Sequence, residues 1–281
     1  MFERFSRSWA LVKASGSVLM QDQKLLVFPL ISGLAALLVV ACFALPLLGF
    51  AALDGLSGGG VWSVGSYVIA FLFYLTQYFV IFFFNAALVG AAMIRLDGGT
   101  PTIGDGLDLA MSKWKSILGY AAIAATVGLA LRALQERVGF IGKIIVGLLG
   151  AGWTMATFLV VPVLVARDVG PLDAVKESVI LLKKTWGENV IGQAGIGVAF
   201  AMIQFAAIIF GVILVLAALF TQSAVAIIVA ILLAITLVIF TALIHAALSG
   251  IYAAALYRYA TGNRETVGFD STALQGAFAP K

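Results

Sequence analysis

The sequence has very few residues of the kinds that build disulfide frameworks and metal centres. Its 281 residues include one cysteine, Cys42, and one histidine, His245. A disulfide framework needs paired cysteines, and a protein metal site usually combines several cysteine, histidine or carboxylate ligands. The sequence therefore predicts no disulfide, no metal site and no cofactor, since His245 alone is thin support for haem ligation.

Sequence motifs of common enzymes are also missing. The chain has no G-x-S-x-G, no H-E-x-x-H, no phosphate-binding glycine loop and no paired carboxylates. The segment 98–106 is rich in glycine, but it lacks the following Lys-Ser/Thr and the preceding strand of a phosphate-binding loop. We interpret it as a loop and a helix start, and we expect the protein not to be an enzyme.

Charged residues are scarce, at 11% of the chain, whereas hydrophobic residues make up 63%. A soluble domain has about 25% and 45–50% respectively. Most of the six long apolar runs exceed the ~20 residues that cross a ~30 Å hydrocarbon core. This pattern predicts an all-α membrane protein with six transmembrane helices in one domain, 1–262, followed by a tail, 263–281. The runs are 25–53, 61–96, 116–134, 140–167, 189–221 and 224–260.

The basic residues alternate between the two sides of these runs. Fourteen of the 17 fall in every second gap, whereas the gaps 54–60 and 221–223 hold none. The positive-inside rule then places both termini in the cytoplasm. The basic residues border the spans, where anionic lipid headgroups lie, so the basic pI predicts no nucleic-acid partner. None of the 13 acidic residues lies deep in a span, which argues against an ion-driven pump.

Three of the basic gaps show apolar residues at helical spacing, which predicts three amphipathic helices. Thr102, three residues before Asp105, predicts a helix N-cap, and Pro171 suits a first helical turn. The helices either lie in the membrane interface or pack on the cytoplasmic base of the bundle, and the two arrangements are compatible. The apolar stripes are Phe2, Phe5, Trp9, Val12, Gly16 and Leu19, then Ile103, Leu107, Met111 and Trp114, then Leu172, Val175, Val179, Leu182 and Trp186.

Several residues of these helices are candidates for lipid contact. Tryptophan side chains prefer the depth of the headgroups, and basic side chains attract anionic lipids. The candidates are Trp9, Trp114, Trp186, Arg4, Arg7, Lys183 and Lys184.

The chain also divides into three similar units, 1–97, 98–168 and 169–262, each with an amphipathic helix and two spans. Asn85–Gly90 resembles His245–Gly250, and Thr157–Pro162 keeps the polar start and a helix weakener five residues later. All three units begin on the same side of the membrane. The sequence therefore predicts a parallel threefold repeat rather than an inverted one.

The polar residue that starts each of these motifs is expected near the middle of the bilayer. Asn85 lies ten residues, about 15 Å of helix, before Arg95, and Thr157 and His245 occupy comparable depths. Such groups either form hydrogen bonds between helices or surround a site for a substrate, an ion or water. The long runs 61–96 and 224–260 must tilt, protrude, or break near Gly90 and Gly250.

Two resemblances to known families follow from short motifs. Phe2–Trp9, Lys24–Gly33, Ala255–Gly262 and Phe269–Phe278 resemble a family of uncharacterised bacterial six-span membrane proteins, a domain of unknown function. That resemblance implies a bacterial inner-membrane protein and supplies no activity. Phe28–Ile31 is weakly similar to the sulfate-permease/EI-type family, from which no site residue is transferred.

Two functions remain open from the sequence. The first is a passive channel or permease for a small solute or ion, which predicts a water-accessible path touching Asn85, Thr157 or His245. The second is a non-transporting scaffold that binds lipids or partner proteins through the basic amphipathic helices. In both cases membrane lipids are the expected partners, and a homo-oligomer or a partner membrane protein is left open.

Overall fold

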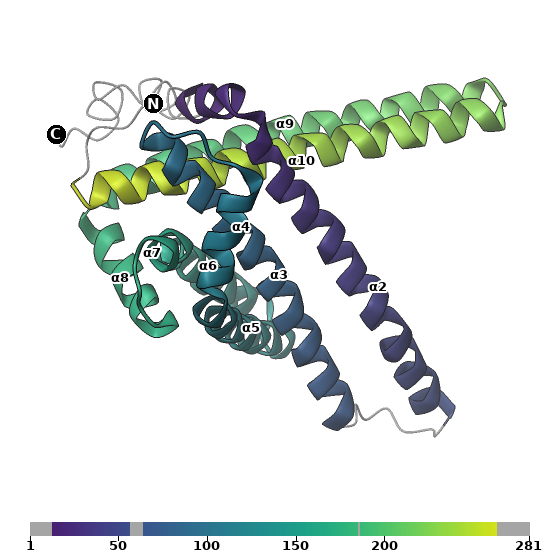
Figure 1. Ribbon diagram of the computed structural model, residues 1–281. Coiled ribbons are helices and arrows are strands. Elements are labelled where there is room, and N and C mark those ends of the chain that lie inside the picture. The colour runs from purple at the N-terminus through teal and green to yellow at the C-terminus, as the bar shows by residue number, and fades with distance from the viewer. Residues whose placement is uncertain (1–12, 57–63, 185, 263–281) are drawn as a thin grey trace.

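The computed structural model describes residues 13–56, 64–184 and 186–262 (Figure 1). All regular structure in these ranges is helical, which confirms the predicted all-α class. The helices are 13–21, η1 (Gln23–Leu26), α2 (Val27–Leu56), α3 (Val64–Leu96), α4 (Ile103–Ser112), α5 (Trp114–Arg137), α6 (Phe140–Ala156), α7 (Val160–Ala166), α8 (Pro171–Lys184), α9 (Trp186–Phe220) and α10 (Ala224–Ala260).

Six segments of the described chain are long and apolar enough to cross a membrane, and they correspond to the six predicted runs. The protein is thus a multi-pass membrane protein. In each third of the described chain a short helix precedes a pair of long ones: 13–21 before α2–α3, α4 before α5–α6, and α8 before α9–α10. This order agrees with the predicted units, while the internal repeat and the domain limits stay predictions.

Local capping fixes the connection between α3 and α4. The N–H of Gly99 donates to the carbonyl of Ile94 (3.0 Å), and the preceding Gly98 has φ +86°, a left-handed conformation that glycine adopts readily. At the start of α4, Thr102 Oγ accepts from the N–H of Asp105 (3.1 Å), whose carboxylate accepts from the N–H of Thr102 (2.8 Å). The hydrogen bonds between the two residues lower the pKa of Asp105. They also confirm the predicted N-cap at Thr102.

The longest buried stretches lie near the end of the second span of each unit. Every residue of 86–92, 159–165 and 250–258 is buried, and we call these three segments the core. A helix that is buried on all sides must have neighbours on all sides. Here α3 packs against both α7 and α10, and many of the residues are alanine or glycine, which let helices approach closely.

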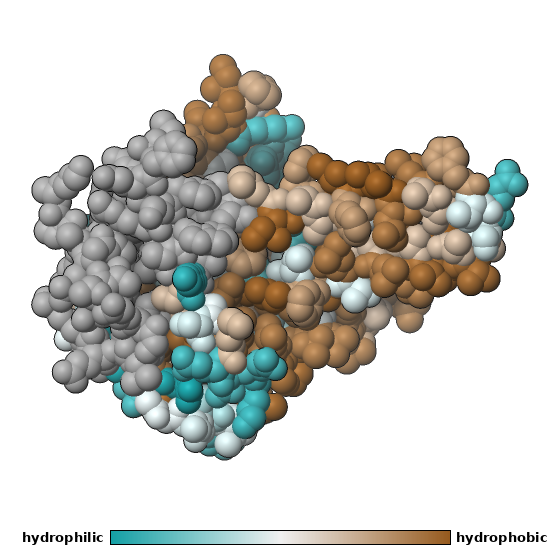
Figure 2. Space-filling view, turned by 90° about the horizontal axis from the view of Figure 1, so that it is seen from above, coloured by the Kyte–Doolittle hydropathy of each residue, from teal (hydrophilic) through white to brown (hydrophobic). Residues whose placement is uncertain are grey.

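Away from the core the helix pairs diverge. In Figure 1 the α9–α10 pair and the α2–α3 pair extend from the core in different directions. Large apolar side chains on them are exposed, such as Leu37 (65%) on α2 and Phe205 (66%) on α9. The space-filling view shows the α9–α10 arm largely apolar, with hydrophilic atoms at its far end (Figure 2). A surface of this kind suits hydrocarbon rather than water.

Neither long helix breaks at the glycine that the sequence analysis considered. α3 continues through Gly90, and α10 continues through Gly250. Both glycines instead allow close contacts with neighbouring helices. A Cβ on Gly90 would lie 3.0 Å from Leu109, and one on Gly250 would lie 2.5 Å from Leu88.

Candidate functional site

The fourth span is discontinuous. α6 ends at Ala156 and α7 begins at Val160, and the residues between them form turns. Pro162 explains the break, because its ring has no N–H for the carbonyl of Phe158 and collides with that carbonyl in a regular helix. Here the N–H of Val160 donates to the carbonyl of Thr157 (3.1 Å), three residues earlier instead of the four of an α-helix. The break therefore leaves backbone groups that need other partners.

A serine from another helix supplies these partners. Ser178 of α8 is fully buried, and its hydroxyl donates to the carbonyl of Ala156 (2.7 Å) and accepts from the N–H of Leu159 (3.2 Å). Ala174, one turn earlier on α8, is also fully buried, so two small residues bring α8 close to the break. Broken helices are tolerated in membranes where side chains of neighbouring helices satisfy the freed backbone groups.

A pocket of about 270 Å³ lies beside this break. Its walls come from α2, α3 and α10, together with Phe158 from the break itself. Its polar side chains are Ser32, Asn85 and Ser249, and none of its residues is ionisable. The lining residues are Pro29, Ser32, Ile81, Phe84, Asn85, Leu88, Phe158, Ala246, Ser249, Gly250 and Ala253.

Asn85 is the central polar residue of the pocket. The structure gives its amide no hydrogen bond to any other described residue. Its Oδ1 lies 3.4 Å from the position that a Cβ on Gly250 would take, so the amide faces α10 across the pocket. Asn85 is half-buried, and an amide without a hydrogen-bond partner costs several kcal/mol where it meets hydrocarbon. The amide is thus positioned to bind water or a solute.

The other two residues of the predicted polar layer have partners of their own. Thr157 is buried and its hydroxyl donates to the carbonyl of Trp153 (2.8 Å). The ring of His245 stacks on Phe200 of α9, with centroids 4.8 Å apart. One turn away, Thr241 Oγ donates to Gln204 Oε1 (2.9 Å), so this part of α10 contributes polar contacts within the α9–α10 pair.

The structure brings the three helix segments together, but not the three predicted side chains. The helix segments converge, because Phe158 and Ala246, which follow Thr157 and His245 in the chain, line the pocket with Asn85. No contact recorded among the described side chains joins Asn85, Thr157 and His245 directly. That these residues form a functional layer stays a prediction.

The residues predicted to contact lipid headgroups are described in part. Trp114 is 42% exposed, with the ammonium of Lys115 5.8 Å from its ring centroid, and Lys183 is exposed. Both lie at an end of the described bundle where headgroups are expected. The remaining candidates, Trp9, Arg4 and Arg7, and the side chains of Trp186 and Lys184, lie outside the described residues.

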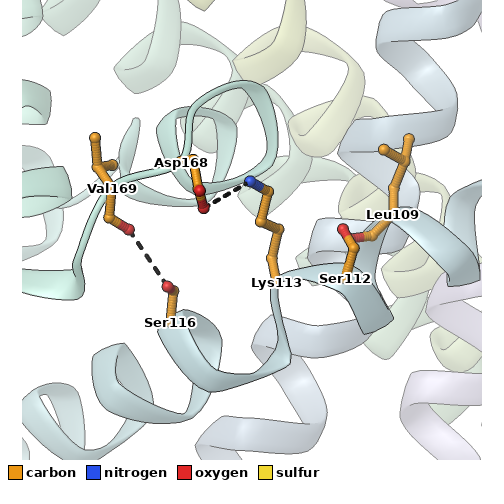
Figure 3. A network of polar contacts seen from close by, with 6 residues as sticks. All are labelled: Leu109, Ser112, Lys113, Ser116, Asp168 and Val169. Atoms are coloured by element: carbon orange, nitrogen blue, oxygen red, sulfur yellow. Dashed lines mark hydrogen bonds and ion pairs between the residues drawn. The ribbon is translucent and has the colours of Figure 1, made fainter.

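Polar contacts at the same end join the α4–α5 corner to the segment that follows α7. Lys113, between α4 and α5, pairs with Asp168 after α7 (3.2 Å), and Ser116 Oγ donates to the carbonyl of Val169 (3.3 Å; Figure 3). Asp168 is 99% exposed, so the ion pair contributes little stability by itself. Its position shows that the ends of α4 and α7 meet beside the core.

The predicted apolar stripes of α4 and α8 are buried only in part, and the amphipathic helices stay a prediction. Met111 and Leu172 belong to the predicted apolar faces, and they are 59% and 63% exposed, as the interfacial arrangement allows. The fully buried positions are instead small: Ala110 on α4, and Ala174 and Ser178 on α8. Small side chains let these short helices approach the backbone of α3 and of the broken span, which turns the larger residues outward.

The sequence analysis missed Ser178, and it did not assign Ser32 or Ser249 to the pocket. A signal for Ser178 was present, because Ala174 and Ser178 form a small-xxx-small pair of the kind that marks close helix contacts in membranes. Ser249 lies inside the motif His245–Gly250, next to the glycine that was considered as a helix weakener.

Comparison with known proteins gives a family and no activity. Residues 64–268 match a family described as "Family of unknown function (DUF6159)". The match includes Ala255–Gly262, one of the motifs behind the resemblance to uncharacterised six-span proteins, and that resemblance is confirmed. No curated protein matches the chain. The weaker resemblance, to the sulfate-permease/EI-type family, has no support.

Proposed function

The chain belongs to the DUF6159 family of unknown function, and we propose that it is a passive permease with its solute site in the pocket around Asn85. The resemblance to uncharacterised bacterial six-span proteins favours the bacterial inner membrane. Both termini are placed in the cytoplasm because 14 of the 17 basic residues lie in alternate gaps. The proposal requires no chemical reaction. It requires only that a solute binds in the pocket and leaves on either side.

The observation that carries the proposal is the amide of Asn85. It lies within a membrane-spanning helix, lines a pocket and has no hydrogen-bonding partner among the described residues. Gln77 Oε1 on the same helix also lacks a partner, but Gln77 does not line the pocket, and Gln204 and Thr241 on α9 and α10 bond to each other. Polar groups inside membranes face the bundle interior or a water-filled cavity and often mark solute pathways.

The broken fourth span supports the same conclusion. Many secondary transporters build their substrate sites from discontinuous helices near the bilayer midplane. Here the break at 157–159 contributes Phe158 to the pocket. Ser178 forms hydrogen bonds to the free backbone groups of the break. The polar side chains of the pocket are therefore not needed for this and can bind a solute.

The scaffold alternative rests on a different observation. The α9–α10 arm exposes large apolar residues that no other described segment covers, such as Phe205 (66%) and Phe240 (55%). A scaffold would use this surface, together with basic residues such as Lys183, to hold lipids or a partner membrane protein. It would not need an amide without a partner inside the membrane, so we favour transport.

Asn85→Leu is expected to reduce solute flux at least about tenfold, equivalent to about 1.4 kcal/mol, because it removes the donor and acceptor of the pocket. The measurement is efflux of glycerol, urea, potassium and chloride from proteoliposomes. Thr126→Val is the control, since Thr126 is exposed, its hydroxyl donates to the carbonyl of Ala122 in its own helix (2.8 Å), and it does not line the pocket. Its flux is expected to stay within about twofold of the native rate.

Two results would contradict the proposal. The first is a native flux no faster than that of protein-free vesicles for all four solutes, which would favour the scaffold. The second is equal flux through the native protein and a correctly folded Asn85→Leu variant, which would place the pathway elsewhere.

A further inference from the structure

We infer that the pocket around Asn85 selects small uncharged solutes that carry hydrogen-bonding groups, and that Ser32, Asn85 and Ser249 recognise them. The inference rests on the proposed function, since it names the class of solute that this site takes. It follows from the charge, the hydrogen-bonding capacity and the size of the pocket, and these are three separate observations.

The first observation is the absence of a fixed charge among the lining residues. The eleven residues of the pocket include no acid, no base and no histidine. The buried cation of the core, Arg258, is paired with Asp97 and also donates to the carbonyl of Met93 (3.3 Å). An ion entering the pocket would lose hydration without meeting an opposite charge, which is costly in a medium of low polarity.

The second observation is the hydrogen-bonding capacity of the pocket. Asn85 offers two N–H donors and a carbonyl acceptor, and each serine hydroxyl can both donate and accept. None of the three side chains is hydrogen-bonded to another described residue, so their donors and acceptors are free to bind a solute. A neutral solute with both donors and acceptors, such as a polyol, an amide or a urea, matches it.

The third observation is size. A volume of about 270 Å³ is slightly below the range of small-molecule pockets, about 300–1,000 Å³. Gly250 preserves this space, because a Cβ there would lie 2.5 Å from Leu88 Cδ2 and 3.4 Å from Asn85 Oδ1. A side chain at position 250 would occupy part of this space and displace Leu88. The solute must therefore be small.

The single native cysteine makes a direct test simple. We replace Cys42 by serine and introduce Ser249→Cys, a change of similar size at the pocket wall, with Ser32→Cys as a second variant in case the first does not fold. Each variant in proteoliposomes is treated with methyl methanethiosulfonate, which is neutral, and with its trimethylammonioethyl and sulfonatoethyl analogues, which are a cation and an anion. Mass spectrometry of the intact protein gives the three reaction rates.

Two control cysteines calibrate these rates. Ser112→Cys lies on an exposed position of α4 and should react with all three reagents. Native Cys42 is exposed on an apolar stretch of α2, at the lipid surface, and it reports on reagent that merely dissolves in the membrane. We expect the pocket cysteine to react with the neutral reagent at least about tenfold faster than with either ion, and at least about tenfold faster than Cys42 does.

The outcomes separate the inference from the proposed function. If the charged reagents label the pocket cysteine as fast as the neutral one, the pocket is an open aqueous path; the neutral preference is then wrong and the permease proposal stands. If both pocket cysteines react no faster than Cys42, the pocket does not admit solutes from water. That result overturns the permease site and the inference together.

Discussion

Gly106→Ala is expected to lower the free energy of unfolding by about 1–3 kcal/mol, the usual cost of overpacking, although it adds only one methyl group. A Cβ on Gly106 would lie 2.7 Å from the backbone oxygen of Ala87 and 2.6 Å from Cζ of Phe28. A flexible side chain could move away from such a contact, but the α3 backbone at Ala87 lies inside the core and cannot. α4 must therefore shift away from α3.

Gly104→Ala, two residues earlier on the same helix, is the matched control. The nearest atom to a Cβ there is Oγ1 of Thr102, at an ordinary 3.6 Å. Alanine also favours a helix over glycine by up to about 1 kcal/mol, so this variant should be as stable as the native protein or slightly more so. Reversible unfolding in detergent measures both. Equal stability of the two variants would show that α4 does not contact α3 as closely as described.

The second large effect is expected for Ser178→Ala. The change removes the donor to Ala156 and the acceptor for Leu159, and an unsatisfied buried polar group costs about 1–3 kcal/mol. Because two backbone groups lose their partner at once, the loss of stability should exceed that of an ordinary surface change severalfold. Since the lost partners lie at the break, the amide of Leu159 should also exchange its hydrogen faster.

Ser112→Ala controls for the loss of a serine hydroxyl as such. Its Oγ is exposed and donates to the carbonyl of Leu109 in the same helix (2.7 Å), so its removal should change stability by less than about 0.5 kcal/mol. Unfolding in detergent and hydrogen exchange of the same samples give both readouts. If Ser178→Ala leaves the exchange of Leu159 unchanged, another group satisfies the break.

The number, limits and type of the spans could be predicted because they depend on local properties of the sequence. A run such as 224–260 must be helical in a membrane, because lipid offers no hydrogen bonds and an α-helix pairs its backbone N–H and C=O groups within the segment. The N-cap at Thr102 is local for the same reason, as its partner Asp105 is three residues away.

The buried faces and the pocket could not be predicted in this way. In water, apolar periodicity separates inside from outside, but in a membrane Met111 and Leu172 are stable when they face outward. The buried faces of these short helices carry small side chains, as at Gly106 and Ser178. Small residues are common elsewhere in this chain, so they do not identify a buried face by themselves. The pocket combines residues of α2, α3 and α10 that are more than 50 positions apart, such as Ser32 and Asn85, so no local pattern contains it.

The position of the core has a consequence for biogenesis. Ribosomes release the chain from its N-terminus, and the three buried segments 86–92, 159–165 and 250–258 leave in that order. The last of them packs against α3, so the first two helix pairs can insert in the membrane but cannot complete the core until residue 258 has been made. Until then the part of the alanine-rich surface of α3 that α10 covers is open to other membrane helices.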